Sequence, residues 1–377
     1  MRLKFSPEQE LFRASIRSFL RDRDIDVRVR ATIDSVQGSG SGHDAETWRA
    51  MAGHLGLQGL TVPEAYGGSG CGQQELAVVL EELGRTLACG AYFSTVALAV
   101  NALLLSGDEQ AQAEYLPAIA EGSSIATVAL TDGSGSWSAA GLTVRADGDS
   151  RLTGTQSFVL AGHIADLILL IAQGGPGPTL YAVRCSALGV TIKPLISMDL
   201  TRPQADVILR NTPARLVGAP GTGPALFARL LDLAGAALAA EQVGGAQRVL
   251  EMAVEYAITR TQFGRQIGSF QAIKHKCADM LVEVESAKSC AYYASLATAT
   301  DSPDLHTASS LAQLRCSQTY LHVAEESILV HGAIGFTWDY PAQLFYKRAS
   351  ADAHYLGGPA HHRQRLADHI GLATSAL

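Results

Sequence analysis

Residues 260–280 decide the fold of this chain, and they read RTQFGRQIGSFQAIKHKCADM. The stretch holds a helix end, a glycine turn and a new helix opened by Ser269, so two helices meet at one loop. Arg260 carries a permanent charge and Phe263 a flat ring, and both flank the turn. This pair suits a phosphate group and a planar ring. Taken alone, the same pattern also fits an ordinary loop with a surface arginine.

Long apolar helices are expected on both sides of this turn. Residues 225–259 form a nearly unbroken apolar run, and residues 270–298 and 304–332 continue the helical pattern. These lengths are far above the roughly 11–12 residues of an average helix. Long helices joined by short loops pack as an antiparallel bundle, so residues 219–377 are predicted to form a C-terminal four-helix bundle domain.

The chain before the bundle changes character twice. Residues 1–122 are patterned as helices, with a helix start at Ser6-Pro7. Residues 123–218 hold short β-rich runs separated by Gly, Pro, Asp and Asn, which is typical of a small β-barrel or sandwich. The predicted fold class is therefore a multidomain α+β protein. Its parts are an N-terminal all-α domain (1–122), a middle β domain (123–218) and the helical bundle (219–377).

The composition excludes several classes of protein. The chain has 377 residues, of which 47% are apolar and 17% charged, so it is too apolar to be disordered. Its 29 Lys and Arg against 36 Asp and Glu give a net charge of −7, so no basic surface for nucleic acid is expected. We expect neither a signal peptide nor an apolar stretch of membrane-helix length. Six scattered cysteines without a CxxC pair fit a reducing, cytoplasmic setting.

A helical bundle raises the question of a di-iron site, which needs Glu-x-x-His motifs on facing helices. The sequence contains no such motif, and its C-terminal histidines lack the spacing of a ligand set, so no metal site is expected. The histidines of residues 361–369 are expected to lie on a solvent-exposed helix. No Gly-x-Gly-x-x-Gly leads from a strand into a helix, so a Rossmann site is not expected either.

Four segments together resemble the acyl-CoA dehydrogenase family. Residues 260–280 match its Arg-x-x-Phe-Gly, Phe-Gln and Ala-(Asp/Glu)-Met elements, and residues 62–70 resemble its N-terminal loop. Leu130-Thr131, before Gly133 and Ser136, resembles its Thr-Glu-Pro-x-x-Gly-Ser flavin strand. Residues 331–336, His-Gly-Ala-Ile-Gly-Phe, resemble its late Gly-Gly-x-Gly-Phe turn. Order and distances agree with the family, whose architecture has the same α–β–α order.

The resemblance implies FAD as the cofactor and assigns residues to it. In the family, the arginine of Arg-x-x-Phe-Gly reaches the FAD pyrophosphate of a neighbouring subunit, and here that residue is Arg260. Phe158 stands where the family usually has a Trp against the flavin ring. The positions assigned to the cofactor by resemblance are Arg260, Gln262, Phe263, Phe270, Gln271, Thr131, Phe158 and Gly332. The resemblance also assigns Ser136 and Asp232 to the binding of substrate.

The catalytic base that the family uses is missing. Counted from Arg348, the Glu of its Tyr-Glu-Gly-Thr loop is replaced by Gly357, and its alternative base position in the long helix is Ala234. Glu241 lies about two turns past Ala234 on the same helix face. A carboxylate buried among alanines is a candidate general base, because desolvation favours proton uptake. It can equally be a hydrogen-bonded structural residue at a helix contact.

The resemblance implies FAD-dependent α,β-dehydrogenation of an acyl-CoA thioester by one subunit of an oligomer. In particular, the chain resembles the small, base-lacking subunits of actinobacterial heteromeric acyl-CoA dehydrogenases. This implies a homo- or hetero-tetramer with a homologous subunit, a role in fatty acid or sterol degradation, and electron-transfer flavoprotein as the acceptor. One alternative is a non-catalytic structural subunit that completes a flavin pocket. Another is an acyl-carrier-protein dehydrogenase or oxidase of a biosynthetic pathway. Neither a nucleic acid nor a membrane is expected as a partner.

Overall fold

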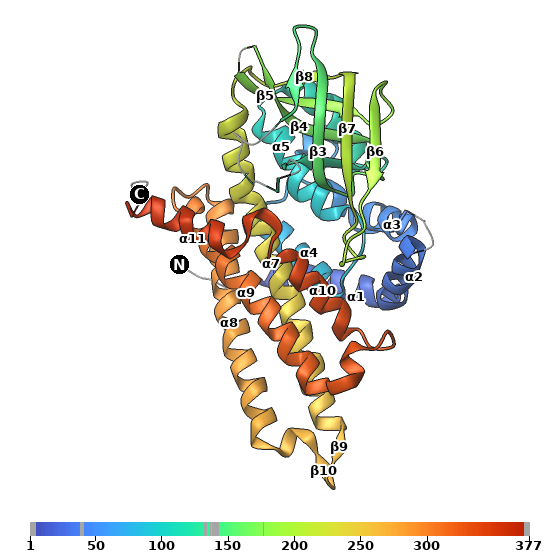
Figure 1. Ribbon diagram of the computed structural model, residues 1–377, viewed down its shortest axis with the longest axis vertical. Coiled ribbons are helices and arrows are strands. Elements are labelled where there is room, and N and C mark those ends of the chain that lie inside the picture. Colours follow the sequence, from blue (N-terminus) through green and yellow to red (C-terminus); the bar gives the residue numbers. More distant parts are fainter. Residues whose placement is uncertain are drawn as a thin grey trace. The chain divides into compact units, whose positions relative to one another are not determined.

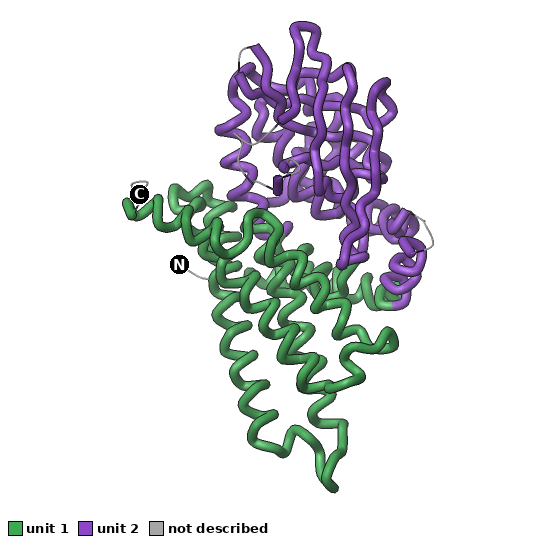
Figure 2. The backbone as a smooth tube through the Cα atoms, viewed as in Figure 1, with its two compact units in different colours: residues 1–26, 77–88, 235–377 green, residues 27–76, 89–234 purple. Residues whose placement is uncertain are grey.

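The computed structural model describes residues 5–37, 41–131, 134, 135, 137, 143–175 and 177–372 (Figure 1). Contacts divide the chain into two compact units, which Figure 2 shows in different colours. Unit 1 comprises residues 1–26, 77–88 and 235–377, and unit 2 comprises residues 27–76 and 89–234. The domain boundaries expected after residues 122 and 218 divide the chain by sequence order, and they stay predictions.

Unit 1 is built mainly from long helices. The helix α7 (Gly223–Thr259) begins in unit 2 and runs on through unit 1, where α8 (Gln271–Ala299) packs along α9 (Leu305–His331). The helices α10 (Ala342–Asp352) and α11 (Gly358–His369) pack on α9. The predicted C-terminal helical domain is therefore confirmed. The remaining elements of this unit are α1 (Pro7–Asp22), most of α4 (Gln73–Arg85), β9 (Thr261–Gln262), β10 (Arg265–Gln266), η5 (Ile267–Ser269), η6 (Gly332–Phe336) and η7 (Tyr355–Gly357).

Unit 2 carries the β-structure. In the described residues, one eight-stranded sheet has the order β6-β7-β3-β2-β4-β5-β8, with β1 pairing with β4 in parallel. The central strand β4 (Leu167–Gly174) is buried along most of its length, which explains its unbroken apolar run. The predicted middle β region is thus confirmed. The other strands are β1 (Ala126–Ala129), β2 (Arg145–Ala146), β3 (Arg151–Leu160), β5 (Gly177–Arg184), β6 (Val190–Pro194), β7 (Gln204–Pro213) and β8 (Arg215–Val217).

Unit 2 also contains helices that precede the sheet along the chain, as the helical pattern before residue 122 predicts. They are α2 (Ile25–Gln37), α3 (Ala45–Leu55), η1 (Leu57–Gly59), η2 (Glu64–Tyr66), the π-helix η3 (Phe93–Val100), α5 (Asn101–Leu105) and α6 (Glu109–Ala120). The predicted helix start at Ser6 is also confirmed for α1. The Ser6 hydroxyl accepts from the Gln9 N–H at 3.2 Å, and the Gln9 side chain accepts from the Ser6 N–H at 2.8 Å.

The helix α7 corrects one expectation from the sequence. Within the described residues it is long and apolar enough to cross a membrane by length and composition, although no stretch of that length was expected. However, 78% of its most apolar window is buried inside the protein. The apolar side chains of α7 therefore serve the protein core.

Two glycines let α4 and α7 touch backbone to backbone in unit 1. A Cβ added at Gly84 would overlap the carbonyl of Glu241, and a Cβ added at Gly244 would overlap the carbonyl of Glu81. The contact is reciprocal. Each glycine faces the carbonyl of the residue three positions before the glycine on the other helix. No side chain larger than hydrogen fits at either position without moving a helix.

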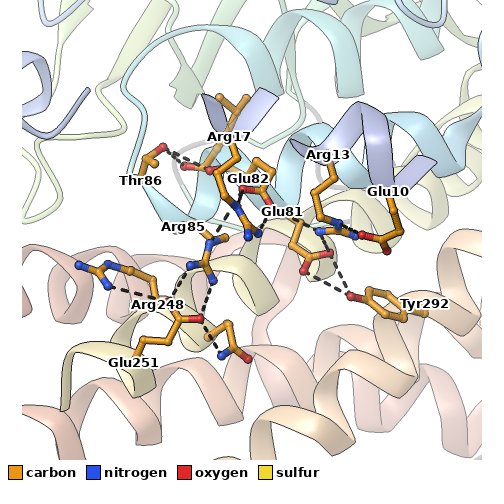
Figure 3. Close-up of polar contacts among 12 residues, drawn as sticks. Glu10, Arg13, Arg17, Glu81, Glu82, Arg85, Thr86, Arg248, Glu251 and Tyr292 are labelled. Atoms are coloured by element: carbon orange, nitrogen blue, oxygen red, sulfur yellow. Dashed lines mark hydrogen bonds and ion pairs between the residues drawn. The ribbon is translucent and has the colours of Figure 1, made fainter. Parts of the chain in front are cut away.

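A network of charges surrounds this helix crossing (Figure 3). Arg13 Nη1 of α1 lies 2.9 Å from Glu81 Oε2, and Arg17 Nη2 lies 2.7 Å from Glu82 Oε1. Arg85 Nη2 lies 2.6 Å from Glu251 Oε2 of α7. Burial raises the pKa of Glu81, although Arg13 opposes this shift. The network ties α1, α4 and α7 together through the buried carboxylates of Glu81 and Glu82 and the half-buried carboxylate of Glu251.

We predict that Gly244→Ala destabilises the protein by about 1–3 kcal/mol, because the new methyl group overlaps the Glu81 carbonyl. The matched control is Gly53→Ala in α3, where a Cβ would meet nothing within 4 Å. That change is expected to stabilise the protein by about 0.5–1 kcal/mol, because alanine is the better helix former. Chemical denaturation of both variants measures the difference. Equal effects at the two positions would contradict the close-contact explanation.

Candidate active site

The segment after α7 forms a tight hairpin that presents an aromatic ring. Phe263 and Gly264 lie between the paired residues Gln262 and Arg265, with φ angles of 54° and 73°. Positive φ at both central residues defines the turn that best suits a two-residue hairpin, and it is strained for a phenylalanine. The Phe263 side chain is 90% exposed, and its ring meets Phe270 edge-on at 6.1 Å between centroids.

Polar groups flank this hairpin at the two helix ends. Arg260, after the end of α7, is exposed, as are Gln262 in β9 and Gln271 at the start of α8. The amide of Gln271 lies 3.4 Å from His275 Nε2, and the Ile267 N–H donates to the Arg260 carbonyl at 2.8 Å. The structure therefore brings these predicted cofactor residues together with Phe263 and Phe270 on one exposed junction.

In unit 2, Thr131 and Phe158 are brought together by the backbone. The Thr131 hydroxyl donates to the Ser157 carbonyl at 2.8 Å, and the Ser157 N–H donates to the Thr131 carbonyl at 3.1 Å. The pairing of β3 with β7 is irregular between Gln156 and Val159, so Phe158 sits in a bulge with φ 57°. Its side chain is 42% exposed. The buried hydroxyl of Thr131 thus fixes the bulge that turns an aromatic ring outward.

The predicted late glycine turn follows the end of α9. Gly332 has φ 67° and ψ −143°, a conformation that favours glycine, and a Cβ there would meet nothing within 4 Å. Gly335 is different, because a Cβ there would lie 3.2 Å from the Cβ of His331. The turn therefore packs against the last turn of α9 while leaving the Gly332 backbone accessible.

Glu241 takes part in a buried ion pair. Arg348 Nη1 of α10 donates to Glu241 Oε1 at 2.6 Å, and the two side chains are 3% and 7% exposed. Gln242, the next residue, is fully buried and donates to the Asp352 carbonyl at 3.5 Å. Ala234 is also fully buried. The buried ion pair stabilises the charged form of Glu241 and fixes its side chain between α7 and α10, which favours a structural role for this residue.

The loop at Gly357 has no room for the family's glutamate. Leu356, Gly357 and Gly358 all have positive φ, with 106° at Gly357, and a Cβ there would lie 2.5 Å from the ring of His361. The ring of His361 thus fills the space where a side chain at position 357 would begin. Its neighbour His362 is 2% exposed, and burial lowers the pKa of His362 to about 3. The expectation that residues 361–369 lie on a solvent-exposed helix is therefore wrong for His362.

Of the two predicted substrate residues, the structure describes one. Asp232 on α7 is 6% exposed, whereas Ser136 lies outside the described residues. Among the described residues, no group of three His, Cys, Asp or Glu side chains could hold a metal ion.

Comparison with known proteins identifies the class. The family profile described as "Acyl-CoA dehydrogenase, N-terminal domain" matches residues 6–123, and "Acyl-CoA dehydrogenase, C-terminal domain" matches residues 221–371. The chain is 34% identical over 363 residues to acyl-CoA dehydrogenase IpdE2 of Mycolicibacterium smegmatis, covering 96% of this chain and 98% of that protein. IpdE2 of Mycobacterium tuberculosis is 32% identical over 363 residues, with 96% and 97% covered.

Solved structures agree with the sequence comparison. A Tcur3481-Tcur3483 steroid ACAD variant is 32% identical with a TM-score of 0.88, over 98% of this chain and 99% of that chain. A chain of the ChsE4-ChsE5 complex from Mycobacterium tuberculosis is 27% identical with a TM-score of 0.89, over the whole of both chains. The fold and sequence define a flavin-dependent oxidoreductase that acts on CH–CH bonds. The chain belongs to the acyl-CoA dehydrogenase family.

The residues present fit the FAD that this family uses. The exposed guanidinium of Arg260 can make charge-assisted hydrogen bonds to a pyrophosphate, and the open backbone at Gly332 lets a ligand approach closely. The outward rings of Phe158 and Phe263 are suited to pack on flat heterocycles. When bound, FAD supplies the group that accepts a hydride from the substrate. The assignments of single residues to FAD stay predictions.

Some residues of the site were not found from the sequence. The pairing of Arg348 with Glu241 is not expected from the sequence. His361 was missed as the side chain that fills the space beside Gly357. Neither pairing carries a signal in the local sequence, because the burial of Arg348 is seen only in the structure.

We predict that Arg260→Ala weakens FAD binding by about 1.5–3 kcal/mol, because it removes a charge-assisted hydrogen bond to a phosphate. Fluorescence titration of the assembled, flavin-free protein with FAD measures this loss. The control is Arg210→Ala, which removes another exposed arginine from β7 in unit 2. Unchanged affinity in Arg260→Ala would contradict the assignment.

Proposed function

We propose that this chain is the base-lacking subunit of an oligomeric acyl-CoA dehydrogenase, in which a homologous subunit supplies the general base. The proposal rests on the residues found at the three positions where a catalytic base could stand. Gly357 is glycine with its side-chain space filled by His361, Ala234 has no acid, and Glu241 is paired with Arg348. A dehydrogenase needs a proton acceptor within hydrogen-bonding reach of the substrate α-carbon.

The chemistry explains why the missing base matters. Dehydrogenation breaks two C–H bonds of the substrate: a base takes the α-hydrogen as a proton, and FAD, held by the residues named above, would supply the acceptor for the β-hydrogen as a hydride. The electron pair of the α-C–H bond becomes part of the new double bond. This chain would contribute ring contacts through Phe158 and a phosphate contact through Arg260. Its Thr131 hydroxyl, bound to the Ser157 carbonyl, would hold Phe158 in place.

The proposed substrates are acyl-CoA thioesters from sterol degradation. Support comes from the 32% identity to a chain described as a steroid ACAD. A similar chain from the ChsE4-ChsE5 complex supports a hetero-oligomer, here a tetramer. The fatty acid, structural-subunit and biosynthetic readings remain alternatives. The biosynthetic alternative is supported by similarity to the prolyl acyl carrier protein oxidase AnaB, with 25% sequence identity.

Two further parts of the proposal concern the setting. Electron-transfer flavoprotein is the proposed acceptor, supported by a similar chain in a structure described as an electron transferring flavoprotein of Acidaminococcus fermentans. A cytoplasmic location is proposed because all six cysteines are free.

We predict that the purified chain alone turns over acyl-CoA about 10²–10⁴-fold more slowly than its complex with a homologous base-carrying subunit. Flavin bleaching on addition of a steroid-derived acyl-CoA measures turnover, and light scattering measures the assembly. Butyryl-CoA serves as the straight-chain comparison. A chain that is fully active by itself would refute the base-lacking assignment. A complex that binds no FAD after reconstitution would refute the flavin site.

We predict that Glu241→Gln destabilises the protein by about 3–5 kcal/mol, because it removes the carboxylate that pairs with the buried Arg348 guanidinium. The double variant Glu241→Gln/Arg348→Met should recover part of this loss, as contacting residues do in a double-mutant cycle. Glu285→Gln is the control, since it breaks an exposed pair with Lys288. If Glu241→Gln instead keeps full stability and FAD but abolishes the turnover of the chain alone, Glu241 is the base.

A further inference from the structure

His331 is enclosed at the end of α9, directly before the Gly332 turn. Its side chain is buried, its Nδ1 lies 2.6 Å from the Ser327 carbonyl, and its Nε2 lies 2.9 Å from the Tyr340 hydroxyl. The ring packs against Tyr256 and Tyr340, with centroids 4.5 and 4.6 Å away, and the two tyrosine rings meet each other edge-on at 6.3 Å. The imidazole is therefore held on two edges and by two neighbouring rings.

These contacts fix the tautomer of the ring. A backbone carbonyl can only accept, so Nδ1 must carry the proton that reaches Ser327. In the neutral ring Nε2 is then an acceptor, and the Tyr340 hydroxyl donates to it. Burial lowers the pKa of His331 below the usual 6.5, so the neutral form is present at neutral pH.

The hydrogen bond from Tyr340 to His331 spans the whole of η6. One partner directly precedes Gly332, and the other follows the turn that includes Gly335 and Thr337. Inside this span, the Thr337 N–H donates to the Ile334 carbonyl at 3.1 Å, and Gly335 packs on His331 and Ile328. The side chains of Ile334 and Phe336 within this span are exposed, and Lys347 of α10 lies over the exposed ring of Trp338 at 4.7 Å.

We propose that His331 and Tyr340 are positioning residues, and that their hydrogen bond holds the Gly332 turn in the shape that binds FAD. The inference rests on the proposed assignment of Gly332 to the cofactor and extends it to two residues that do not touch the ligand. The two neighbouring tyrosine rings restrain the imidazole, and the bond to Ser327 ties it to α9. Loss of the Tyr340 hydroxyl releases the far side of the turn from α9.

The arrangement also gives FAD binding a pH dependence. The groups facing the pair are Tyr256 on α7, Ser327 on α9, and, near Tyr340, Glu255 and Arg248 on α7. The pKa of His331 is lowered while its ring is buried and accepts from Tyr340. Protonation of His331 therefore favours a turn in which this hydrogen bond is broken. The stabilisation is fully present above about pH 6.5, the ordinary value for histidine, and is lost as the pH falls through the lowered value.

The test is FAD affinity, measured by fluorescence titration of the assembled, flavin-free protein at about pH 7.5 and about pH 5.5. Tyr340→Phe keeps the ring and removes the hydroxyl, and it is expected to weaken FAD binding about five- to tenfold at the higher pH. His331→Gln keeps an acceptor for Tyr340 without an ionisable group. It is expected to retain most of the affinity and to lose less of it at the lower pH than the unaltered protein does.

The matched control is Tyr293→Phe, which removes a tyrosine hydroxyl from an exposed bond to Asp304 in the same unit. It should leave FAD affinity unchanged at both pH values. Equal FAD affinity in Tyr340→Phe and the unaltered protein, with FAD still bound, overturns the positioning role alone. Absence of FAD binding by the unaltered assembly overturns the proposed function instead. Hydrogen exchange at the Gly332 amide gives a second readout, and faster exchange is expected in Tyr340→Phe.

Discussion

The backbone contact between α4 and α7 is the constraint on which much of unit 1 depends. Gly84 and Gly244 allow each helix to press against a carbonyl of the other, so the spacing of the two helices is set by main-chain atoms. At that spacing, Glu81 and Glu82 are buried, and their charges must be met by Arg13 and Arg17 from α1. The charge network is thus a consequence of the close crossing, because buried carboxylates without partners would be strongly destabilising.

The same crossing explains the condition of Glu241. Its carbonyl faces Gly84, while its carboxylate faces Arg348 on the other side of α7. A residue fixed by its backbone on one side and by a buried ion pair on the other has little freedom to approach a substrate. In this chain, therefore, the one acid in the middle of the long apolar helix serves to join α4, α7 and α10.

The long helices could be predicted from the sequence because α7, α8 and α9 are set by local pattern: apolar runs, few breakers and glycine turns between them. The contacts that define the site are of another kind. Arg348 and Glu241 are far apart in the sequence, and nothing in either local pattern indicates that they pair. The burial of His362 was missed for a similar reason, since a helix rich in His and Arg resembles a solvated one until its packing against the rest of unit 1 is known. The positive φ of Phe158 and Phe263 is also invisible, because phenylalanine disfavours that conformation.

Of the nine residues other than glycine with positive φ in the described part of the chain, Phe158 and Phe263 stand at positions that the family resemblance assigns to the cofactor, and Leu356 stands beside Gly357. Phe158, Phe263 and the loop from Leu356 to Gly358 all have positive φ. Such conformations persist only where surrounding contacts hold them, as the bond between Thr131 and Ser157 does beside Phe158. Gly357 adopts its positive φ without strain because it has no Cβ, and the ring of His361 fills the space where a side chain would begin. Leu356 is the residue of this loop for which positive φ costs energy, because glycine adopts that conformation readily. Its side chain is 2% exposed, so packing in the core of unit 1 holds the loop in this shape.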